Sequence, residues 1–262
     1  MKLFSSLKQR LAQTIHQPVG QAVSTGYQQV AAGTAEAKGR ELRDSWQNAS
    51  IPEKQRAIVD PQLKAYRDGV AVPVFDALVE SLMVNVNDLS GSRVLEIGCS
   101  SGYYSEVFEI KGLGLHYEGC DYSSAFIDLA RRLYPGIHFD VQDATELKYG
   151  DASFDIAVSG GCILHIPEYS RAIAEAARVS RRWVVFHRTP VLHMTGPATY
   201  TKQAYGVDTI EIHFNEQALV RLFRKHGMHV VDINTHSIGW DAAQSDAMAM
   251  KTYLCEKITT HD

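Results

Sequence analysis

The chain of 262 residues contains only four cysteines and no long apolar run. The cysteines, Cys99, Cys120, Cys162 and Cys255, lie far apart and lack the CxxC and Cys/His spacings of tetrahedral zinc sites. They are therefore expected to be reduced thiols, most of them buried. No stretch approaches the roughly eighteen apolar residues of a membrane-spanning helix, and residues 1–17 lack the continuous apolar core of a signal peptide. These absences predict a cytoplasmic protein without a membrane span.

A surplus of basic residues is also absent. The 26 Lys and Arg residues are outnumbered by 30 Asp and Glu residues, so the formal net charge is -4 at pH 7. Such a chain has no global attraction for phosphate backbones, and no nucleic-acid partner is expected. Its 45% hydrophobic and 21% charged residues are typical of globular proteins. The length suits one large α/β domain with an extension.

Residues 1–90 are predicted to form a helical N-terminal extension. Phe4, Leu7, Leu11 and Ile15 recur at helical spacing with basic residues between them, which predicts an amphipathic helix. A basic amphipathic helix can lie on a membrane surface, but packing onto the chain's own domain or onto a second subunit is commoner. A homodimer formed through the N-terminal helices is therefore allowed.

The rest of this extension carries weaker signals. Residues 19–39, rich in Gly, Ala, Gln and Thr, contain no β-rich run and are expected to link two helices. Ser50, followed by Pro52 and Glu53, has the features of an N-cap and a first helical turn. Apolar residues at helical spacing between 62 and 83 predict two helices leading into the next domain.

From Gly91 onward, short apolar runs alternate with helical patterns. This alternation predicts an α/β fold with a doubly wound, seven-stranded, mostly parallel sheet. No helical pattern separates the last two strands, only a loop over residues 236–248, so the last strand is expected to be antiparallel. The predicted strands are 93–97, 115–120, 137–141, 154–159, 183–187, 230–234 and 251–256. The predicted helices between them are 103–111, 123–134, 168–179 and 215–226.

The first of these strands leads into a turn of small residues. Residues 98–102, with the sequence Gly-Cys-Ser-Ser-Gly, lie between a buried strand and a helix, where backbone N–H groups can face a ligand carboxylate. Asp121 ends the second strand about twenty residues later, a position from which carboxylates bind ribose hydroxyls. The alternative role of Asp121 is to cap the helix that starts near Ser123.

In their order and spacing, these elements resemble the class I S-adenosylmethionine (SAM)-dependent methyltransferases, in particular the branch that acts on small molecules. The resemblance covers residues 94–187 and includes an acidic residue before G-x-G-x-G, with Ser100 replacing the middle glycine. It implies a Rossmann-like domain over residues 91–262, SAM as cofactor and S-adenosylhomocysteine (SAH) as product. The cofactor-binding residues that it implies are Glu96, Gly98, Cys99, Ser100, Gly102, Tyr104, Asp121, Tyr122, Asp143, Ala144, Gly160 and Gly161.

The resemblance also implies individual roles. Glu96 would hold the turn or reach the amino group of SAM through water, and Asp121 would bind the ribose. Asp143 would accept from the adenine amine beside the backbone N–H of Ala144, although an aspartate at a strand end also suits a solvated turn. Of the two tyrosines that begin the following helix, Tyr104 is assigned to the cofactor and its neighbour to the core.

Residues for the methyl acceptor are predicted from position. His165 follows the fourth motif and His187 ends the fifth strand, and either imidazole could act as a general base. A histidine at position 165 can equally well be structural. No carboxylate cluster with metal-ligand spacing accompanies the motif, so no metal is expected. The substrate-binding candidates, which lie in or next to an irregular acceptor-side insert at 189–214, are Arg188, Tyr200, Tyr205, Glu211 and His213.

These features predict methyl transfer to a small polar molecule such as a metabolite, natural product or sugar, with oxygen slightly favoured over nitrogen because histidines are available as bases. Three alternatives remain. Residues 98–102 also match the G-x-S-x-G nucleophile elbow of α/β-hydrolases, with Ser100 as nucleophile. A non-catalytic protein could retain the fold as a binding or scaffold module. A dinucleotide oxidoreductase is the third, but its G-x-G-x-x-G motif would require glycine at Ser100 and at Tyr103, and this turn has neither.

Overall fold

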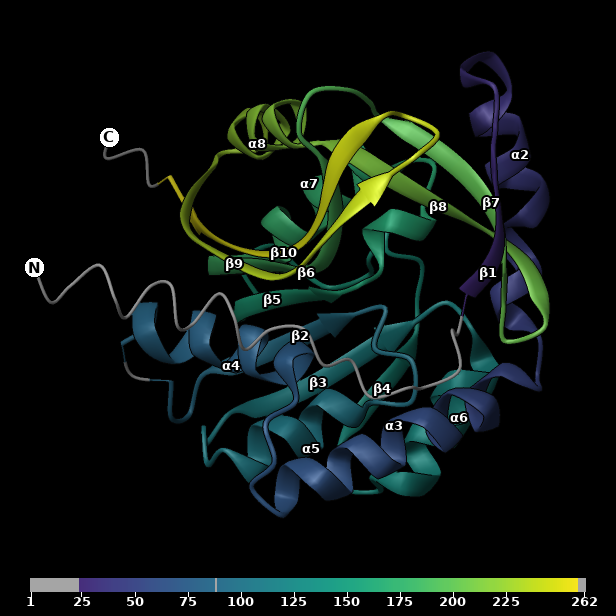
Figure 1. Ribbon diagram of the computed structural model, residues 1–262. Coiled ribbons are helices and arrows are strands. Elements are labelled where there is room, and N and C mark those ends of the chain that lie inside the picture. Colours follow the sequence, from purple (N-terminus) through teal and green to yellow (C-terminus); the bar gives the residue numbers. More distant parts are fainter. Residues whose placement is uncertain (1–23, 88, 259–262) are drawn as a thin grey trace, which may run out of the picture.

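A mixed sheet with helices on both faces organises the chain (Figure 1). The computed structural model describes residues 24–87 and 89–258, so the amphipathic helix predicted between Phe4 and Ile15 lies outside the described residues. Within these ranges the sheet has ten strands, three more than the seven predicted. None of the helices in the same ranges is long and apolar enough to cross a membrane.

Seven strands form the expected doubly wound sheet. From β4 to β6 neighbouring strands pair in parallel, whereas β10 runs antiparallel to both β6 and β9. The mostly parallel sheet with an antiparallel last strand is thus confirmed. In spatial order the strands are β4 (His138–Val141), β3 (His116–Asp121), β2 (Arg93–Ile97), β5 (Phe154–Gly160), β6 (Ser180–Leu192), β10 (Asp246–Lys257) and β9 (Met228–Asp241).

Three further strands extend the sheet beyond β6. The end of β6 pairs in parallel with β8 (Val207–Asn215), which pairs antiparallel with β7 (Ala198–Ala204), and β7 pairs antiparallel with β1 (Ser24–Gln29). The irregular insert predicted at 189–214 is therefore wrong, as is the linker predicted at 19–39, which contains β1. Both segments lack a clear apolar alternation, because polar side chains occupy buried positions in β7 and β8.

Helices connect the strands near the predicted positions. The four predicted crossover helices are present, and α3, which begins after Ser50 as predicted, continues through Pro61 as one helix. Gly39, in α2, is buried against Pro167, and a Cβ there would lie 2.2 Å from the proline Cγ. In chain order the helices are η1 (Ala32–Thr34), α2 (Ala35–Leu42), η2 (Arg43–Gln47), α3 (Ile51–Arg67), α4 (Pro73–Asn85), α5 (Tyr103–Ile110), α6 (Ser124–Leu133), η3 (Ile163–His165), α7 (Tyr169–Val179) and α8 (Glu216–Lys225).

Successive side chains of a strand point to opposite faces of the sheet, so those of the buried strands pack in two separate cores. On β6, Val184 and Phe186 face α7 and α8, whereas Val185 between them faces α3, α4 and α5. Figure 1 shows the helices divided in the same way, with α7 and α8 on one side of the sheet and α3 to α6 on the other. Burial on both faces explains why these strands are continuous apolar runs in the sequence.

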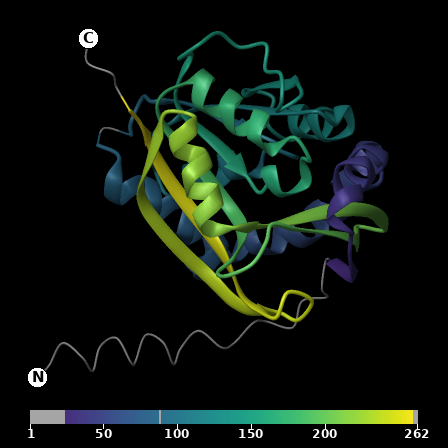
Figure 2. The ribbon, with the colours of Figure 1, turned by 90° about the horizontal axis from the view of Figure 1, so that it is seen from above.

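The hairpin of β9 and β10 is much longer than predicted. Instead of a loop over 236–248, both strands continue beyond the core, and only residues 242–245 turn. Figure 2 shows this hairpin along one side of the molecule, with β7 and β8 reaching toward α2 on another. At its far end Ile238 is 78% exposed and Trp240 66% exposed, so burial does not impose an alternating pattern that sequence analysis could detect.

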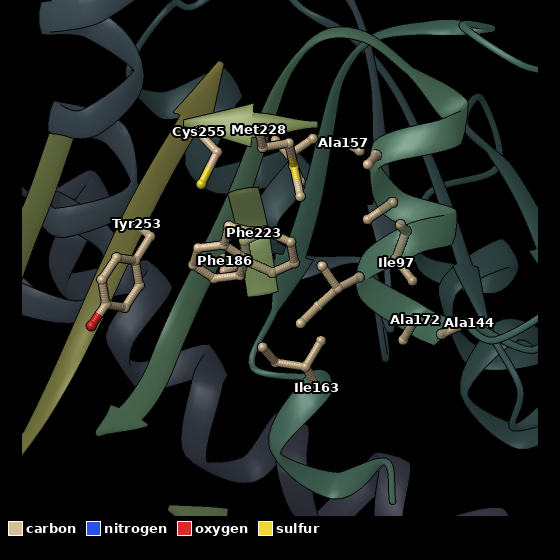
Figure 3. Close-up of a cluster of buried hydrophobic side chains, with 14 of the residues drawn as sticks. Ile97, Ala144, Ala157, Ile163, Ala172, Phe186, Phe223, Met228, Tyr253 and Cys255 are labelled. Carbon is tan, nitrogen blue, oxygen red and sulfur yellow. The ribbon is translucent and has the colours of Figure 1, made fainter. Parts of the chain in front are cut away.

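A stack of two phenylalanines joins α8 to the sheet. Phe186 and Phe223 are both fully buried, and their rings lie 4.4 Å apart at an angle of 8° (Figure 3). Tyr253 on β10 packs beside them and contacts the Phe223 ring edge-on. The stack therefore holds α8 against both β6 and β10.

Replacement of Phe223 by alanine should remove this stack and leave a cavity. We expect Phe223→Ala to lower the free energy of unfolding by about 3–5 kcal/mol, measured by urea denaturation. Ile238→Ala removes an apolar side chain that is already in solvent and should change it little. Equal losses in the two variants would contradict the packing described here.

Candidate functional site

A cavity of about 450 Å³ lies at the carboxyl ends of the parallel strands. Its floor comes from the segments that follow β2, β3, β4 and β5, and its roof from η2 and α3. Strands β1, β7 and β8 form a side wall. Open α/β sheets bind ligands at this edge. Of the residues predicted for the site, those that line the cavity are Gly98, Ser100, Asp121, Tyr122, Asp143, Ala144, Gly160, Gly161, His165, Arg188, Tyr205 and Glu211.

The turn after β2 has the backbone conformation of a glycine-rich loop. Gly98 and Gly102 have φ values of 72° and 75°, and Ser100 between them has a φ of 50°. Left-handed φ costs an ordinary residue about 1–2 kcal/mol, so Ser100 adopts at some cost the conformation that the middle glycine of the motif adopts freely. The Ser100 N–H compensates in part by donating to Asp121 Oδ2 over 3.0 Å.

Asp121, at the end of β3, holds this turn through the hydrogen bond from Ser100. Its second oxygen accepts from the Ser123 N–H at the start of α6 over 2.9 Å, and the same side chain lines the cavity. Burial raises the pKa of Asp121 from 3.8 to about 6, against the backbone hydrogen bonds, which lower it. The carboxylate is therefore ionised above pH 6 and available to accept hydrogen bonds from a ligand.

Glu96 lies beneath the cavity instead of lining it. It is 1% exposed, and the Tyr117 hydroxyl donates a hydrogen bond to it. Its other oxygen occupies the space above Gly160, where a Cβ would come within 2.5 Å. Burial raises the pKa of Glu96 well above its usual range, which the hydrogen bond from Tyr117 only partly offsets. Cys99 and Gly102 likewise pack below the turn, Gly102 against the Phe139 ring.

Asp143 is held by two other parts of the chain. Its Oδ1 accepts from the N–H and the hydroxyl of Thr145 over 2.9 and 2.8 Å, and its Oδ2 forms an ion pair with Arg43 from η2. Burial raises its pKa, but these hydrogen bonds and the arginine charge outweigh burial and lower the pKa. Asp143 is thus an ionised carboxylate that also joins the segment after β4 to η2 through its ion pair with Arg43.

His165 is fixed as a neutral imidazole. Its Nδ1 lies 2.6 Å from the Ile210 carbonyl, so Nδ1 carries the proton and Nε2 holds a lone pair. The Trp46 ring packs on it at 4.7 Å. Burial and the charge of Lys202 lower the pKa of His165 to about 4. At neutral pH this side chain can accept a proton or a hydrogen bond but carries no charge.

His187 and Tyr104 do not reach the cavity. The Tyr104 hydroxyl lies 2.8 Å from His187 Nε2, and Thr252 Oγ1 lies 2.7 Å from Nδ1, so both ring nitrogens are occupied. Both residues are about 1% exposed. The tyrosine that does line the cavity is Tyr103, the reverse of the predicted assignment. Two consecutive helical residues point in directions about 100° apart, and the sequence alone did not show which one faces inward.

The side wall contains a buried network of charges. Glu211 pairs with Lys202 and accepts from His213 Nε2 over 3.0 Å, while His213 Nδ1 lies 2.9 Å from Asp241. Tyr200 also donates to Asp241, over 2.6 Å. Tyr200 and His213 therefore belong to the support of the wall and do not line the cavity, whereas Lys202 and Glu211 do.

Most of the roof was missed in the sequence. Arg43, Trp46 and Gln55 line the cavity but belong to the N-terminal extension, for which no site residue was predicted. The single usable signal was Trp46, a large aromatic residue in an otherwise polar stretch. Tyr27, on β1, was equally unexpected and donates to Glu211 over 3.3 Å.

Comparison with known proteins identifies the central segment. Residues 95–185 match the family model of the methyltransferase domain. Over 96 residues the chain is 35% identical to a phthiotriol/phenolphthiotriol dimycocerosates methyltransferase of Mycobacterium ulcerans, and the match covers 36% of this chain and 35% of that protein. The matched segments span 35% to 41% of the length of such curated relatives.

Solved structures share the fold over a larger part of the chain. A SAM-dependent methyltransferase from Methanosarcina mazei aligns with a TM-score of 0.54 at 19% identity, over 68% of this chain and 97% of that one. The 1,6-didemethyltoxoflavin-N1-methyltransferase of Burkholderia thailandensis, solved with 1,6-didemethyltoxoflavin and SAH bound, aligns with a TM-score of 0.50 at 18% identity, over 79% and 91% of the two chains.

The close contact at Gly98 offers a test of the turn. A Cβ at this glycine would lie 2.6 Å from the Cβ and Sγ of Cys162 and would also occupy a left-handed φ. Gly98→Ala should therefore lower the free energy of unfolding by about 2–5 kcal/mol, the sum of backbone strain and overpacking. Gly91→Ala is the control, because its φ is 80° but nothing lies within 4 Å. If thermal unfolding shows equal losses, the clash is absent.

Proposed function

We propose that this chain, whose residues 95–185 form a methyltransferase domain of the class I fold, transfers the methyl group of SAM to a small organic acceptor. The observation that carries the proposal is the convergence, in one cavity, of the Gly98 turn, Asp121 and Asp143 at the ends of three neighbouring strands. No other reading of the sequence uses all three.

The residues present suit this cofactor. Gly98 and Gly160 line the cavity with backbone alone, because Cys162 and Glu96 fill the positions that their Cβ atoms would occupy. Asp121 would accept from the ribose hydroxyls, and Asp143 with the N–H of Ala144 would face the adenine. Glu96, buried beneath Gly160, would balance the amino group of the methionyl part. Bound SAM supplies an electrophilic methyl group on a sulfonium, so the chain needs to orient the acceptor and remove its proton.

His165 is the base that the geometry favours. It lines the cavity, and its Nδ1–H is committed to the Ile210 carbonyl, which leaves the Nε2 lone pair to receive a proton. His187 is not proposed as a base, because Tyr104 and Thr252 occupy both of its nitrogens. A neutral base of this kind suits an acceptor whose own proton is acidic, since the pKa of His165 is only about 4.

The acceptor is a small molecule in this proposal. A volume of about 450 Å³ lies within the range of small-molecule pockets. Aromatic residues of the roof and wall, including Trp46 and Tyr205, would pack on the acceptor. Oxygen remains slightly favoured over nitrogen as the methylated atom, because a base is needed for a hydroxyl. In this scheme residues 1–90 serve as the cap of the domain at 91–262.

The hydrolase alternative lacks a partner for Ser100. The described residues include no histidine that hydrogen-bonds the Ser100 hydroxyl, and its backbone N–H is committed to Asp121. A serine nucleophile requires an adjacent base. A non-catalytic scaffold would have no need for the open cavity beside His165.

Removal of the Asp121 charge should weaken cofactor binding. We expect Asp121→Asn to lower the affinity for SAH at pH 8 by about 1–3 kcal/mol, measured by calorimetry. In the unliganded protein the pKa of Asp121 is about 6, so protonation below pH 6 removes the charged acceptor. The affinity of the wild type for SAH should therefore fall as the pH drops below 6, by up to about tenfold per pH unit. The Asn variant should show a flatter pH dependence.

Asp140→Asn provides the matched control on the neighbouring strand. Asp140 lies on β4 outside the cavity, beside Tyr149 and His138. This variant should bind SAH as the wild type does. Wild-type affinity in Asp121→Asn at pH 8 would rule out the ribose assignment, and absence of SAH binding by the wild type would overturn the proposed function.

The protonation state of His165 can be measured directly. In ¹⁵N-histidine NMR spectra the His165 imidazole should stay neutral at pH 7 and titrate near pH 4, with the proton on Nδ1. Spectra of His165→Ala would assign the signal. The same variant should keep its SAH affinity but lose turnover with any acceptor found by screening. A charged imidazole at pH 7 would contradict the proposed base.

A further inference from the structure

Arg188 is aimed into the cavity by a bulge in β6. Thr189 pairs with Lys251 and Phe186 pairs with Tyr253, so two residues of β6 lie opposite one residue of β10. Arg188, the second of the two, has a φ of 55°. Such a bulge redirects a side chain, and a non-glycine residue held at this φ is a strained feature of the kind that gathers at functional sites. Arg188 consequently lines the cavity, with its side chain passing over Gly161.

The guanidinium of Arg188 has no carboxylate partner. No carboxylate oxygen of the described residues lies within ion-pair distance of it. The other two cations that line the cavity differ in this respect, because Arg43 pairs with Asp143 and Lys202 with Glu211. Among the cations that line the cavity, Arg188 is therefore the one whose guanidinium no carboxylate of the described residues holds, so it is available to a ligand.

The groups around Arg188 are neutral. The phenols of Tyr103, Tyr104 and Tyr205 lie near the guanidinium, and burial raises the pKa of each, so none is ionised at pH 7. Burial and the Arg188 charge lower the pKa of His187 and His236. The Arg188 side chain is exposed and lines the cavity, so an anionic group of a ligand can reach its guanidinium.

The sulfonium of the proposed cofactor would add a positive charge to the same cavity. We propose that the methyl acceptor is a small organic acid whose anionic group pairs with Arg188, an inference that rests on the proposed function. The acid would lie between the guanidinium and the sulfonium, with its unsaturated or aromatic part against Tyr103 and Tyr205. An arginine binds a carboxylate through two parallel hydrogen bonds, so it would also fix the orientation of the acceptor.

The experiment compares two ligands of nearly the same size and shape, one anionic and one neutral. The protein is saturated with SAH, and benzoate and benzamide are titrated by ligand-observed NMR. The wild type should bind benzoate at least about tenfold more tightly than benzamide, the ratio expected for one charge-assisted pair. Arg188→Gln should abolish this preference, and Arg188→Lys should retain part of it. SAH affinity should stay unchanged in both variants.

Arg221→Gln is the matched control, because Arg221 is exposed on α8 and does not line the cavity. It should keep the preference for benzoate. Equal binding of benzoate and benzamide to the wild type, or binding of neither, would overturn the proposal of an anionic acceptor. If the wild type still binds SAH in that case, the proposed function stands. Loss of SAH affinity in Arg188→Gln would assign Arg188 to the cofactor and overturn the acceptor proposal. Absence of SAH binding by the wild type would overturn both.

Discussion

The length of β6 is the constraint on which the site depends. This strand of thirteen residues pairs with β5 and β10 in the core and continues far enough to pair with β8 at its end. Within the described residues, this extension is where the β1, β7 and β8 wall pairs with the doubly wound sheet. The same strand contributes Phe186 to the core and Arg188 to the cavity, so one element sets both the packing of α8 and the chemistry of the acceptor side.

Sequence reasoning was most successful where burial imposes a pattern. The central strands are buried on both faces, and amphipathic helices follow β2, β3 and β5, so their apolar runs and order could be predicted. It failed at β7 and β8 for a physical reason. Their buried positions include Lys202, Glu211 and His213, which satisfy one another's charges and remove the apolar alternation that marks a strand.

In the candidate site, residues positioned by local sequence could be predicted, and residues positioned by tertiary packing could not. Asp121 and the Gly98 turn could be predicted because strand, turn and helix are consecutive in the chain, and local geometry brings them to the cavity. His187 and Arg188 were both predicted for the acceptor side, but only Arg188 lines the cavity, since the alternation of a regular strand does not reveal a bulge. The roof was hidden because Arg43 and Trp46 reach the site only through tertiary packing.

The polar network of the side wall also determines when the site can form. Tyr27 donates to Glu211 across 184 residues of sequence, and His213 meets Asp241 from the long hairpin. Contacts of such separation require the intervening chain to be closed into large loops before they stabilise anything. The doubly wound core, built from neighbouring units, can assemble without them. We therefore expect the pocket to be completed late in folding, and in a nascent chain His213 can gain its partner Asp241 only after β9 has been synthesised.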